Sequence, residues 1–183
     1  MSRAFVSESD GDFQDDDLPP IKIPLAPNTR NYMTPEGAER LKSELNHLMH
    51  TERPRIAAAL SRQVSGIEQA DQQTISLSRR RLREVERRIE YLNVMAGRLE
   101  VVETDGQNRQ QVTFGAAVTV ADEKGAARSY RIVGVDESEP EAGRISWISP
   151  LARALIGARA GEVVTVELPE HEVTLKILEI EYR

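Results

Sequence analysis

The feature that most constrains this chain is a long apolar stripe whose members recur at alternating spacings of four and three residues. Its members are Ser78, Leu82, Val85, Ile89, Leu92, Ala96 and Leu99. Such a spacing puts every member on one side of an α-helix and is the a/d pattern of a coiled coil. A single helix cannot bury that stripe, so the chain must supply a partner for it.

A second apolar stripe precedes the first along the chain. It begins after Thr34-Pro35-Glu36, where the threonine can cap backbone N–H groups, proline is tolerated in a first helical turn and the acid complements the helix dipole. Its members are Ala38, Leu41, Leu45 and Leu48, with a looser continuation to Ile56 and Leu60. Pro54 removes one helical hydrogen bond, so we expect a bend or break near Glu52–Arg53.

A polar connection near Ser65-Gly66 separates the two stripes. Because the connection is short, the two helices should lie antiparallel and side by side. The sequence therefore predicts an antiparallel helical hairpin of the coiled-coil type, about 45 Å long at about 1.5 Å per residue.

Beyond about Val112 the apolar pattern changes to the alternation that is typical of β-strands. Five segments have this character: Ala117–Ala121, Tyr130–Val135, Ile145–Ile148, Val163–Leu168 and Val173–Ile180. Between the third and the fourth, a serine cap, a proline and a following glycine predict a short helix within Ser149–Gly157. We therefore expect an α+β chain in which the hairpin precedes a mainly antiparallel β domain.

Composition limits what the chain can be. It has 183 residues, enough for one or two small domains, and a formal net charge of -6, which argues against a surface that is basic throughout. It has no cysteine, which excludes disulfides and thiolate chemistry. The N-terminus lacks the pattern of a secretory signal and no apolar run is long enough to span a bilayer, so we expect a cytoplasmic protein with no membrane partner.

The chain is expected to divide into three segments. Residues 1–30 are rich in aspartate and proline and predict a disordered acidic tail. Residues 31–103 form the hairpin domain, and residues 104–183 form the β domain.

The second helix carries a dense group of arginines. Those assigned as candidate RNA- or channel-binding residues are Arg79, Arg80, Arg83 and Arg87. Guanidinium groups bind phosphate in a bidentate manner, so a basic face on a thin rod suits contact with RNA or with an acidic protein channel. The alternative is a solvated face, because Glu84, Glu86 and Glu90 lie within pairing distance along the helix.

Two carboxylates, Glu68 and Asp71, lie at the connection between the helices. If the second helix has begun there, their spacing of three residues puts them on one face. Protein sites for Mg²⁺ often provide one or two carboxylates and leave the other positions to water and substrate phosphates. The pair would therefore hold no metal alone. A solvated turn is the alternative interpretation.

No arrangement of side chains indicates a catalytic site of the chain's own. His47 and His50 lack the spacing of a zincin motif and His171 falls in a predicted turn, so we interpret all three as surface residues. No nucleophile elbow or glycine-rich phosphate loop follows a predicted strand.

Short motifs occur in both halves of the chain. In the hairpin they are Met33-Thr34-Pro35-Glu36-Gly37, Glu52-Arg53-Pro54 and the run from Arg81 to Leu92; in the β domain they are Tyr130-Arg131-Ile132-Val133-Gly134 and Ser149-Pro150-Leu151-Ala152-Arg153-Ala154-Leu155. Together they resemble the bacterial GreA/GreB family of transcript cleavage factors over about residues 31–182, and the run in the second helix is closer to GreB. The motif that begins at Ser149 is the most specific of them.

The resemblance implies an FKBP-like C-terminal domain that docks on bacterial RNA polymerase, with Ser149, Pro150 and Arg153 in the docking region. The hairpin would enter the polymerase secondary channel, where Glu68 and Asp71 would assist the active site and the arginines would meet the nascent RNA 3′ end. The chain would then be no enzyme and have no cofactor of its own. It would stimulate the polymerase to cleave backtracked RNA, with Mg²⁺ shared at the polymerase site, and so rescue arrested complexes.

The tip departs from the family pattern. Glu68 stands where aspartate is usual and Asp71 where glutamate is usual, so each carboxylate could shift by about 1 Å, enough to cost about 100-fold in a preorganised site. Gln72 and Ile75 also replace the usual asparagine and tyrosine. A non-cleaving modulator or inhibitor of the secondary channel is therefore the first alternative.

A prolyl isomerase is the second alternative, suggested by the FKBP-like domain. It would need an apolar pocket lined by aromatic residues. The candidates in that domain are Phe114, Tyr130, Trp147 and Tyr182. Such a small set makes this activity the weaker of the two alternatives.

Overall fold

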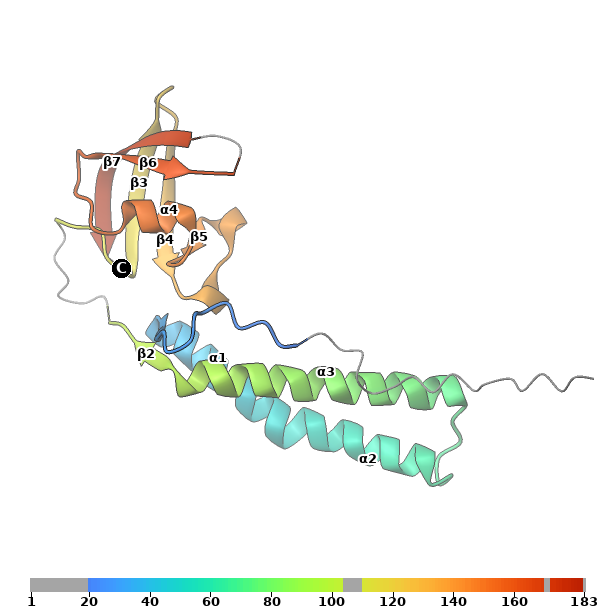
Figure 1. Ribbon diagram of the computed structural model, residues 1–183. Helices are drawn as coiled ribbons and strands as arrows, with labels where there is room; N and C mark the ends of the chain where they lie inside the picture. The colour runs from blue at the N-terminus through green and yellow to red at the C-terminus, as the bar shows by residue number, and fades with distance from the viewer. Residues whose placement is uncertain (1–19, 104–109, 170–171, 183) are drawn as a thin grey trace, which may run out of the picture.

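The computed structural model describes residues 20–103, 110–169 and 172–182. A helical hairpin projects from a β domain that sits at its base (Figure 1). Among the described residues, no helix combines the length and apolar character needed to cross a membrane. The arrangement confirms the predicted α+β class, with an N-terminal hairpin and a C-terminal sheet domain.

The first arm of the hairpin consists of α1 (Pro35–His47), a π-helical segment η1 (Leu48–Glu52) and α2 (Arg53–Val64). The Arg53 N–H bonds to the Leu48 carbonyl five residues back, which widens the helix immediately before Pro54. Proline has no N–H to donate and its ring crowds the preceding turn, so a widened turn accommodates it. The predicted interruption is therefore present as a π-helical turn, and the arm continues without a break.

The second arm is α3 (Gln72–Gly97), whose 26 residues span about 39 Å at about 1.5 Å per residue. Its buried residues are Val85, Leu92 and Met95, which face buried residues of the first arm such as Leu41 and Ile56. The predicted seam is thus present but ends earlier than expected, because α3 stops at Gly97.

A short parallel pair of strands closes the base of the hairpin, and it was not predicted. β1 (Asn31–Met33) pairs with β2 (Leu99–Val101), so Leu99 belongs to a strand and not to the helical seam. Asn31 is fully buried, and its side-chain amide donates to the Met95 carbonyl at 3.2 Å. Strands of three residues leave too little alternation to be detected in a sequence.

The segment before β1 packs against the hairpin base. Leu25 is 4% exposed, and Ile23 contacts the same apolar cluster. The Arg98 guanidinium donates to the Ala26 carbonyl at 3.3 Å. This differs from the disordered tail predicted over residues 1–30, of which residues 1–19 lie outside the described residues.

The β domain is a five-stranded sheet in the order β5-β4-β3-β7-β6. The strands are β3 (Ala116–Asp122), β4 (Ala127–Val133), β5 (Arg144–Ser146), β6 (Val163–Glu167) and β7 (Glu172–Tyr182). The short helix α4 (Pro150–Leu155) packs on the sheet, where its buried Ala152 and Leu155 join the core. All five predicted strands and the predicted helix are present.

One strand pair departs from the antiparallel sheet that we predicted. β4 and β5 are parallel, so the chain must cross over between them. Two 3-10 turns make this crossover, η2 (Val135–Glu137) and η3 (Pro140–Ala142). The crossover lies against the hairpin base, as Figure 1 shows, and places acidic residues there.

Candidate functional site

The tip of the hairpin is built around a left-handed glycine. Gly66 follows α2 with φ of 73°, a conformation that glycine adopts without strain. The backbone N–H of Glu68 then bonds to the Arg62 carbonyl at 3.1 Å. The Arg62 guanidinium also pairs with the Glu68 carboxylate, with 3.4 Å between Nε and Oε2. The position of Glu68 is therefore set by the end of α2.

Asp71 has a structural role at the start of α3. Its Oδ1 accepts a hydrogen bond of 2.7 Å from the Thr74 N–H, which makes Asp71 the N-cap of the helix. Hydrogen bonding from the Thr74 side chain and backbone lowers the pKa of the Asp71 carboxyl below its ordinary value. Because α3 begins at Gln72, Glu68 lies in the loop before the helix. The two acids therefore do not share a helix face.

The tip acids form an incomplete set of metal ligands. Among the described residues there is no group of three or more His, Asp or Glu side chains that could hold a metal ion. The cap engages Oδ1 of Asp71, so its other carboxylate oxygen can still be offered to a cation. The residues present fit Mg²⁺ only if a partner supplies most of the ligands.

Exposed apolar side chains lie at the same end of the hairpin as these acids, a feature that the sequence interpretation missed. Val64, Ile67 and Leu77 are 57, 77 and 59% exposed. Val64 continues the spacing of Ile56 and Leu60 beyond the end of the predicted stripe, whereas Leu77 lies beside the stripe that begins at Ser78. Exposed apolar groups at the end of a projecting rod suit contact with protein rather than with water.

The arginines of α3 occupy two sides of the helix. Arg81 and Arg88 face the first arm, where Arg88 Nε and Nη2 lie 2.7 and 2.9 Å from the Glu44 carboxylate and Arg81 Nη2 lies 3.9 Å from Glu52 Oε1. The other four fall within an arc of about 100°, given 3.6 residues per turn: Arg79, Arg80, Arg83 and Arg87. The residues assigned to RNA or channel binding therefore share a side that is turned away from the first arm.

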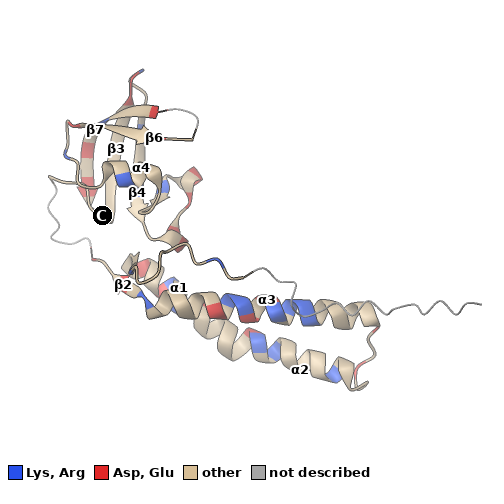
Figure 2. Ribbon diagram, viewed as in Figure 1, with Lys and Arg blue, Asp and Glu red and all other residues tan. Residues whose placement is uncertain are grey.

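Acidic residues modify this basic face without removing it. Glu84 pairs with Arg80 at 3.2 Å and with Arg81 at 3.5 Å, all with exposed side chains. Glu86 pairs across the hairpin with Arg53 at 2.9 Å. Exposed pairs of this kind contribute only about 0.2–1 kcal/mol each, so a phosphate can displace them. Figure 2 shows the resulting concentration of basic residues along the middle of α3.

The residues assigned to docking lie around the N-terminus of α4. Ser149 caps this helix, its hydroxyl oxygen accepting from the Ala152 N–H at 3.2 Å, and Pro150 is the first helical residue. Arg153 is exposed one turn later. The helix is thus capped as predicted, and its charged side chain is free to meet a partner surface.

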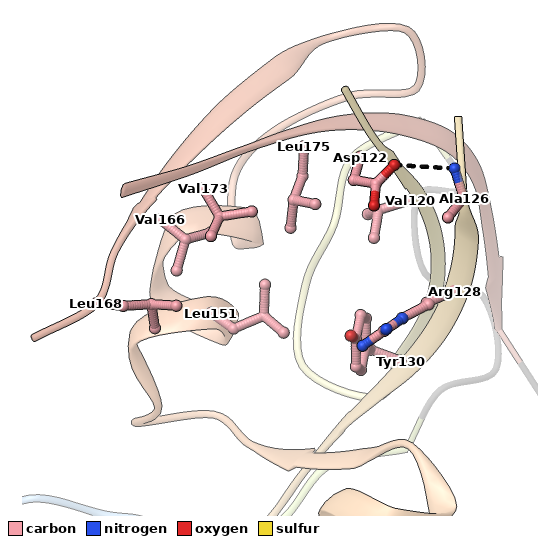
Figure 3. Close-up of a pocket in the computed structure, with 10 residues that line it drawn as sticks. All are labelled: Val120, Asp122, Ala126, Arg128, Tyr130, Leu151, Val166, Leu168, Val173 and Leu175. Atoms are coloured by element: carbon pink, nitrogen blue, oxygen red, sulfur yellow. Dashed lines mark hydrogen bonds between the residues drawn. The ribbon is translucent and has the colours of Figure 1, made fainter. Parts of the chain in front are cut away.

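A cavity of about 260 Å³ lies between α4 and the sheet (Figure 3). Leu151, Val166 and Leu175 line it, and Arg128 lies beside Tyr130 at its edge. Among the described residues, Tyr130 is the one aromatic side chain in the lining. Phe114 and Trp147 instead pack with Tyr32 at the hairpin base, with ring centroids 6.2 and 5.4 Å from the Tyr32 ring. The aromatic lining that a prolyl isomerase needs is therefore not assembled in this cavity.

The sequence interpretation also missed the contact between the two parts of the chain. The Tyr91 hydroxyl on α3 donates to Asp136 in η2 at 2.6 Å. Burial, together with this hydrogen bond to a carboxylate, raises the pKa of Tyr91 well above its ordinary value. The spacing of Gly134 and Glu137 is that of an N-cap and its third helical residue, which indicates a local cap but not a contact with the hairpin.

The fold and these surfaces define a class of protein in which a compact β domain carries a projecting helical hairpin with acids at its tip. Two family models match, "Transcription elongation factor, N-terminal" over residues 31–101 and "Transcription elongation factor, GreA/GreB, C-term" over residues 107–182. The chain belongs to the GreA/GreB family of transcription elongation factors.

Curated relatives support the same assignment. GreB of Neisseria meningitidis serogroup B is 36% identical over 159 residues, covering 86% of this chain and 98% of that protein. GreB of Yersinia pestis is 39% identical over 153 residues, covering 84% and 90% of the two chains. These matches confirm the predicted closer resemblance to GreB.

A crystal structure of GreA factor homolog 1 from Thermus thermophilus also matches, with 22% identity and a TM-score of 0.40. The match covers 83% of this chain and 99% of that chain. A TM-score this low is too weak a likeness to support a conclusion.

Proposed function

We propose that this chain binds bacterial RNA polymerase, inserts its hairpin into the secondary channel and stimulates cleavage of backtracked RNA. The observation that carries the proposal is the location of the loop bearing Glu68 and Asp71, at the end of the hairpin farthest from the β domain (Figure 1). A rod of about 39 Å can carry these acids into a channel while the β domain remains outside.

In this proposal the chain contributes positioning and charge. Asp71 is held ionised by its hydrogen bonds and offers one carboxylate oxygen beyond the cap. Glu68 can exchange its pairing with Arg62 for a cation, because the exposed ion pair is weak. Mg²⁺ at the polymerase site would supply the Lewis acid and the activated water.

The basic face of α3 and the region around α4 have separate roles in the proposal. Arg79, Arg80, Arg83 and Arg87 would contact the extruded RNA 3′ end or the channel wall. Ser149, Pro150 and Arg153 would belong to the surface that docks on the polymerase. Docking and channel contacts are therefore expected to respond to different substitutions.

The competing proposal is a non-cleaving modulator of the channel. It is favoured by the local engagement of both acids, since Asp71 caps α3 and Glu68 pairs with Arg62. Both proposals predict binding to the polymerase, and they differ in the chemistry at the tip.

A transcript cleavage assay on stalled, backtracked complexes separates the two. We expect the wild-type chain to accelerate release of 3′ RNA fragments in the presence of Mg²⁺, and Glu68→Ala to reduce the rate while the Kd for the polymerase stays the same. A wild-type chain that binds the complexes but releases no fragments would establish the modulator instead.

A further inference from the structure

One carboxylate connects the two parts of the chain. Glu137, in the crossover between β4 and β5, is 7% exposed. Its Oε2 accepts from the Thr34 N–H at 3.0 Å and from the Gly134 N–H at 3.0 Å. Its Oε1 accepts from the Thr34 hydroxyl and lies 3.6 Å from Arg40 Nη2. A single side chain of the β domain is thus hydrogen-bonded both to Thr34 at the start of the hairpin and to the backbone of Gly134 in its own domain.

The same contact is part of the cap of α1. The Thr34 hydroxyl accepts from the Gly37 N–H at 3.0 Å and donates to Glu137, so the carboxylate completes a chain of hydrogen bonds that ends on the helix. An anion at this point also complements the positive end of the helix dipole. The first turn of α1 is therefore stabilised by a residue more than one hundred positions away in the sequence.

Close packing leaves the carboxylate little freedom. A Cβ added at Gly37 would lie 2.2 Å from the Glu137 carboxylate, and one added at Gly134 would lie 2.6 Å from Oε2 and 2.7 Å from the Tyr32 carbonyl. Contacts below 3.0 Å cannot be accommodated unless the neighbouring atoms move. The two glycines therefore hold the chain close around this side chain.

The adjacent Asp136 binds the other arm of the hairpin. Its Oδ1 accepts the 2.6 Å hydrogen bond from Tyr91 of α3, whereas Glu137 binds the start of α1. Two neighbouring acids in one 3-10 turn thus contact both arms. Trp147 adds an edge-to-face contact with Tyr32, at 5.4 Å between ring centroids.

We propose that Glu137 is a positioning residue whose carboxylate sets the direction in which the hairpin projects from the β domain. Direction matters because α3 is a lever of about 39 Å, so a rotation of about 10° at its base moves the tip by about 7 Å. Misplacement by about 1 Å can cost on the order of 100-fold in a preorganised site. The consequence for RNA cleavage rests on the proposed function, whereas the consequence for hairpin direction does not.

The direction can be measured on the full chain without polymerase. Because the chain has no cysteine, Gln69→Cys at the tip and Lys124→Cys in the β domain give a unique pair of spin labels. Pulsed electron-electron double resonance should give one narrow distance distribution for the doubly labelled chain that is otherwise wild type. Glu137→Ala should broaden or shift that distribution, because even a rotation of about 10° at the base of α3 moves the tip by about 7 Å. Glu137→Gln should have a smaller effect, because its amide oxygen can still accept from the Thr34 and Gly134 N–H groups.

A second variant tests the proposal if Glu137→Ala does not fold. Gly37→Ala keeps Glu137 and favours helix formation by about 1 kcal/mol, yet its new methyl group displaces the carboxylate. It should also broaden the distribution. Glu141→Ala, which removes an exposed acid from the next 3-10 turn, should leave it unchanged.

A folded Glu137→Ala or Gly37→Ala chain with an unchanged distance distribution would overturn the proposal, whatever the polymerase assays show. If the proposed function also holds, Glu137→Ala should reduce the cleavage rate on the order of 100-fold. The same variant should weaken binding to the polymerase much less than it lowers the cleavage rate, because α4 and Arg153 are unaffected. Glu137→Gln should recover part of the lost cleavage rate, and a Gln variant as defective as Glu137→Ala in both the cleavage rate and the distance distribution would show that the hydrogen bonds to the Thr34 and Gly134 N–H groups do not set the hairpin direction.

Discussion

Asp71 and Thr74 close the first turn of α3 through a 2.7 Å hydrogen bond from the Thr74 N–H to the Asp71 carboxylate. One side chain at the tip therefore caps a helix and is also a candidate ligand for a shared cation. Asparagine caps a helix about as well as aspartate but carries no charge. The two roles can therefore be separated by substitution.

We expect Asp71→Asn to keep α3 intact and to reduce Mg²⁺-dependent cleavage, because an amide oxygen is a weaker ligand for Mg²⁺ than a carboxylate. Asp71→Ala should lose both the cleavage and the first turn of the helix. Circular dichroism and amide exchange at Thr74 report on the helix, and the cleavage assay reports on the chemistry. Equal cleavage by Asp71→Asn and the wild type would remove Asp71 from the proposed site. Asp71→Glu is a poor test of side-chain reach, since glutamate is not a favoured N-cap.

The same hydrogen bond predicts a dependence on pH. The pKa of Asp71 is lower in the folded chain than its ordinary value of 3.8. The contact therefore stabilises the folded chain at pH values above 3.8, and the stabilisation is lost as the pH falls through the lower folded pKa. Acid titration followed by NMR should show the Thr74 amide shifting below about pH 4. The Asp71→Asn chain should show no such transition.

The basic face of α3 is tested by Arg80→Ala, Arg83→Ala and Arg87→Ala in one chain. If these residues contact RNA phosphates, affinity for backtracked complexes should fall more than affinity for complexes without extruded RNA. The slope of log Kd against log salt should decrease by about 2, at about 0.7 per single-strand phosphate contact. A control chain removes the same number of positive charges from hairpin arginines that lie outside this face of α3: Arg53, Arg55 and Arg81. The control should keep the salt slope, and equal losses on both kinds of complex would argue against RNA contact.

The docking assignment is tested by Arg153→Glu. We expect the Kd for the polymerase to rise by about 10-fold, since arginines at interfaces often carry more than 1 kcal/mol of the binding free energy. The matched control is Arg159→Glu, another exposed arginine of the β domain. The melting temperature should be unchanged in both. Identical Kd values for the two variants would place the docking surface elsewhere.

Ser149→Ala tests the cap of α4 separately. Loss of the hydrogen bond to the Ala152 N–H should lower the free energy of unfolding by about 1 kcal/mol. Urea denaturation measures this change. A weaker affinity for the polymerase at a temperature where the variant is fully folded would show that the cap also orients the docking surface.

The sequence determined the elements of this protein, because their signals are local. The a/d stripe predicted α3 and its partner arm, Pro54 predicted the interruption of the first arm, and the cap at Ser149 predicted α4. Alternation of apolar residues located all five strands of the β domain. The short motifs also led to the right family, since their order along the chain is preserved.

The tertiary structure alone decided how these elements are joined. The parallel pairing of β4 with β5 required a crossover, and that crossover brings Glu137 against Thr34. The Gly134 N–H is a local donor to this carboxylate, but the Thr34 N–H and hydroxyl lie more than one hundred residues away, so the sequence does not reveal the contact with the hairpin. Likewise, the pairing of Glu68 with Arg62 depends on where α2 ends. Glu137 is placed by hydrogen bonds to a residue far away in the chain, and Glu68 by the conformation of the turn after α2, neither of which a pattern of residue types specifies.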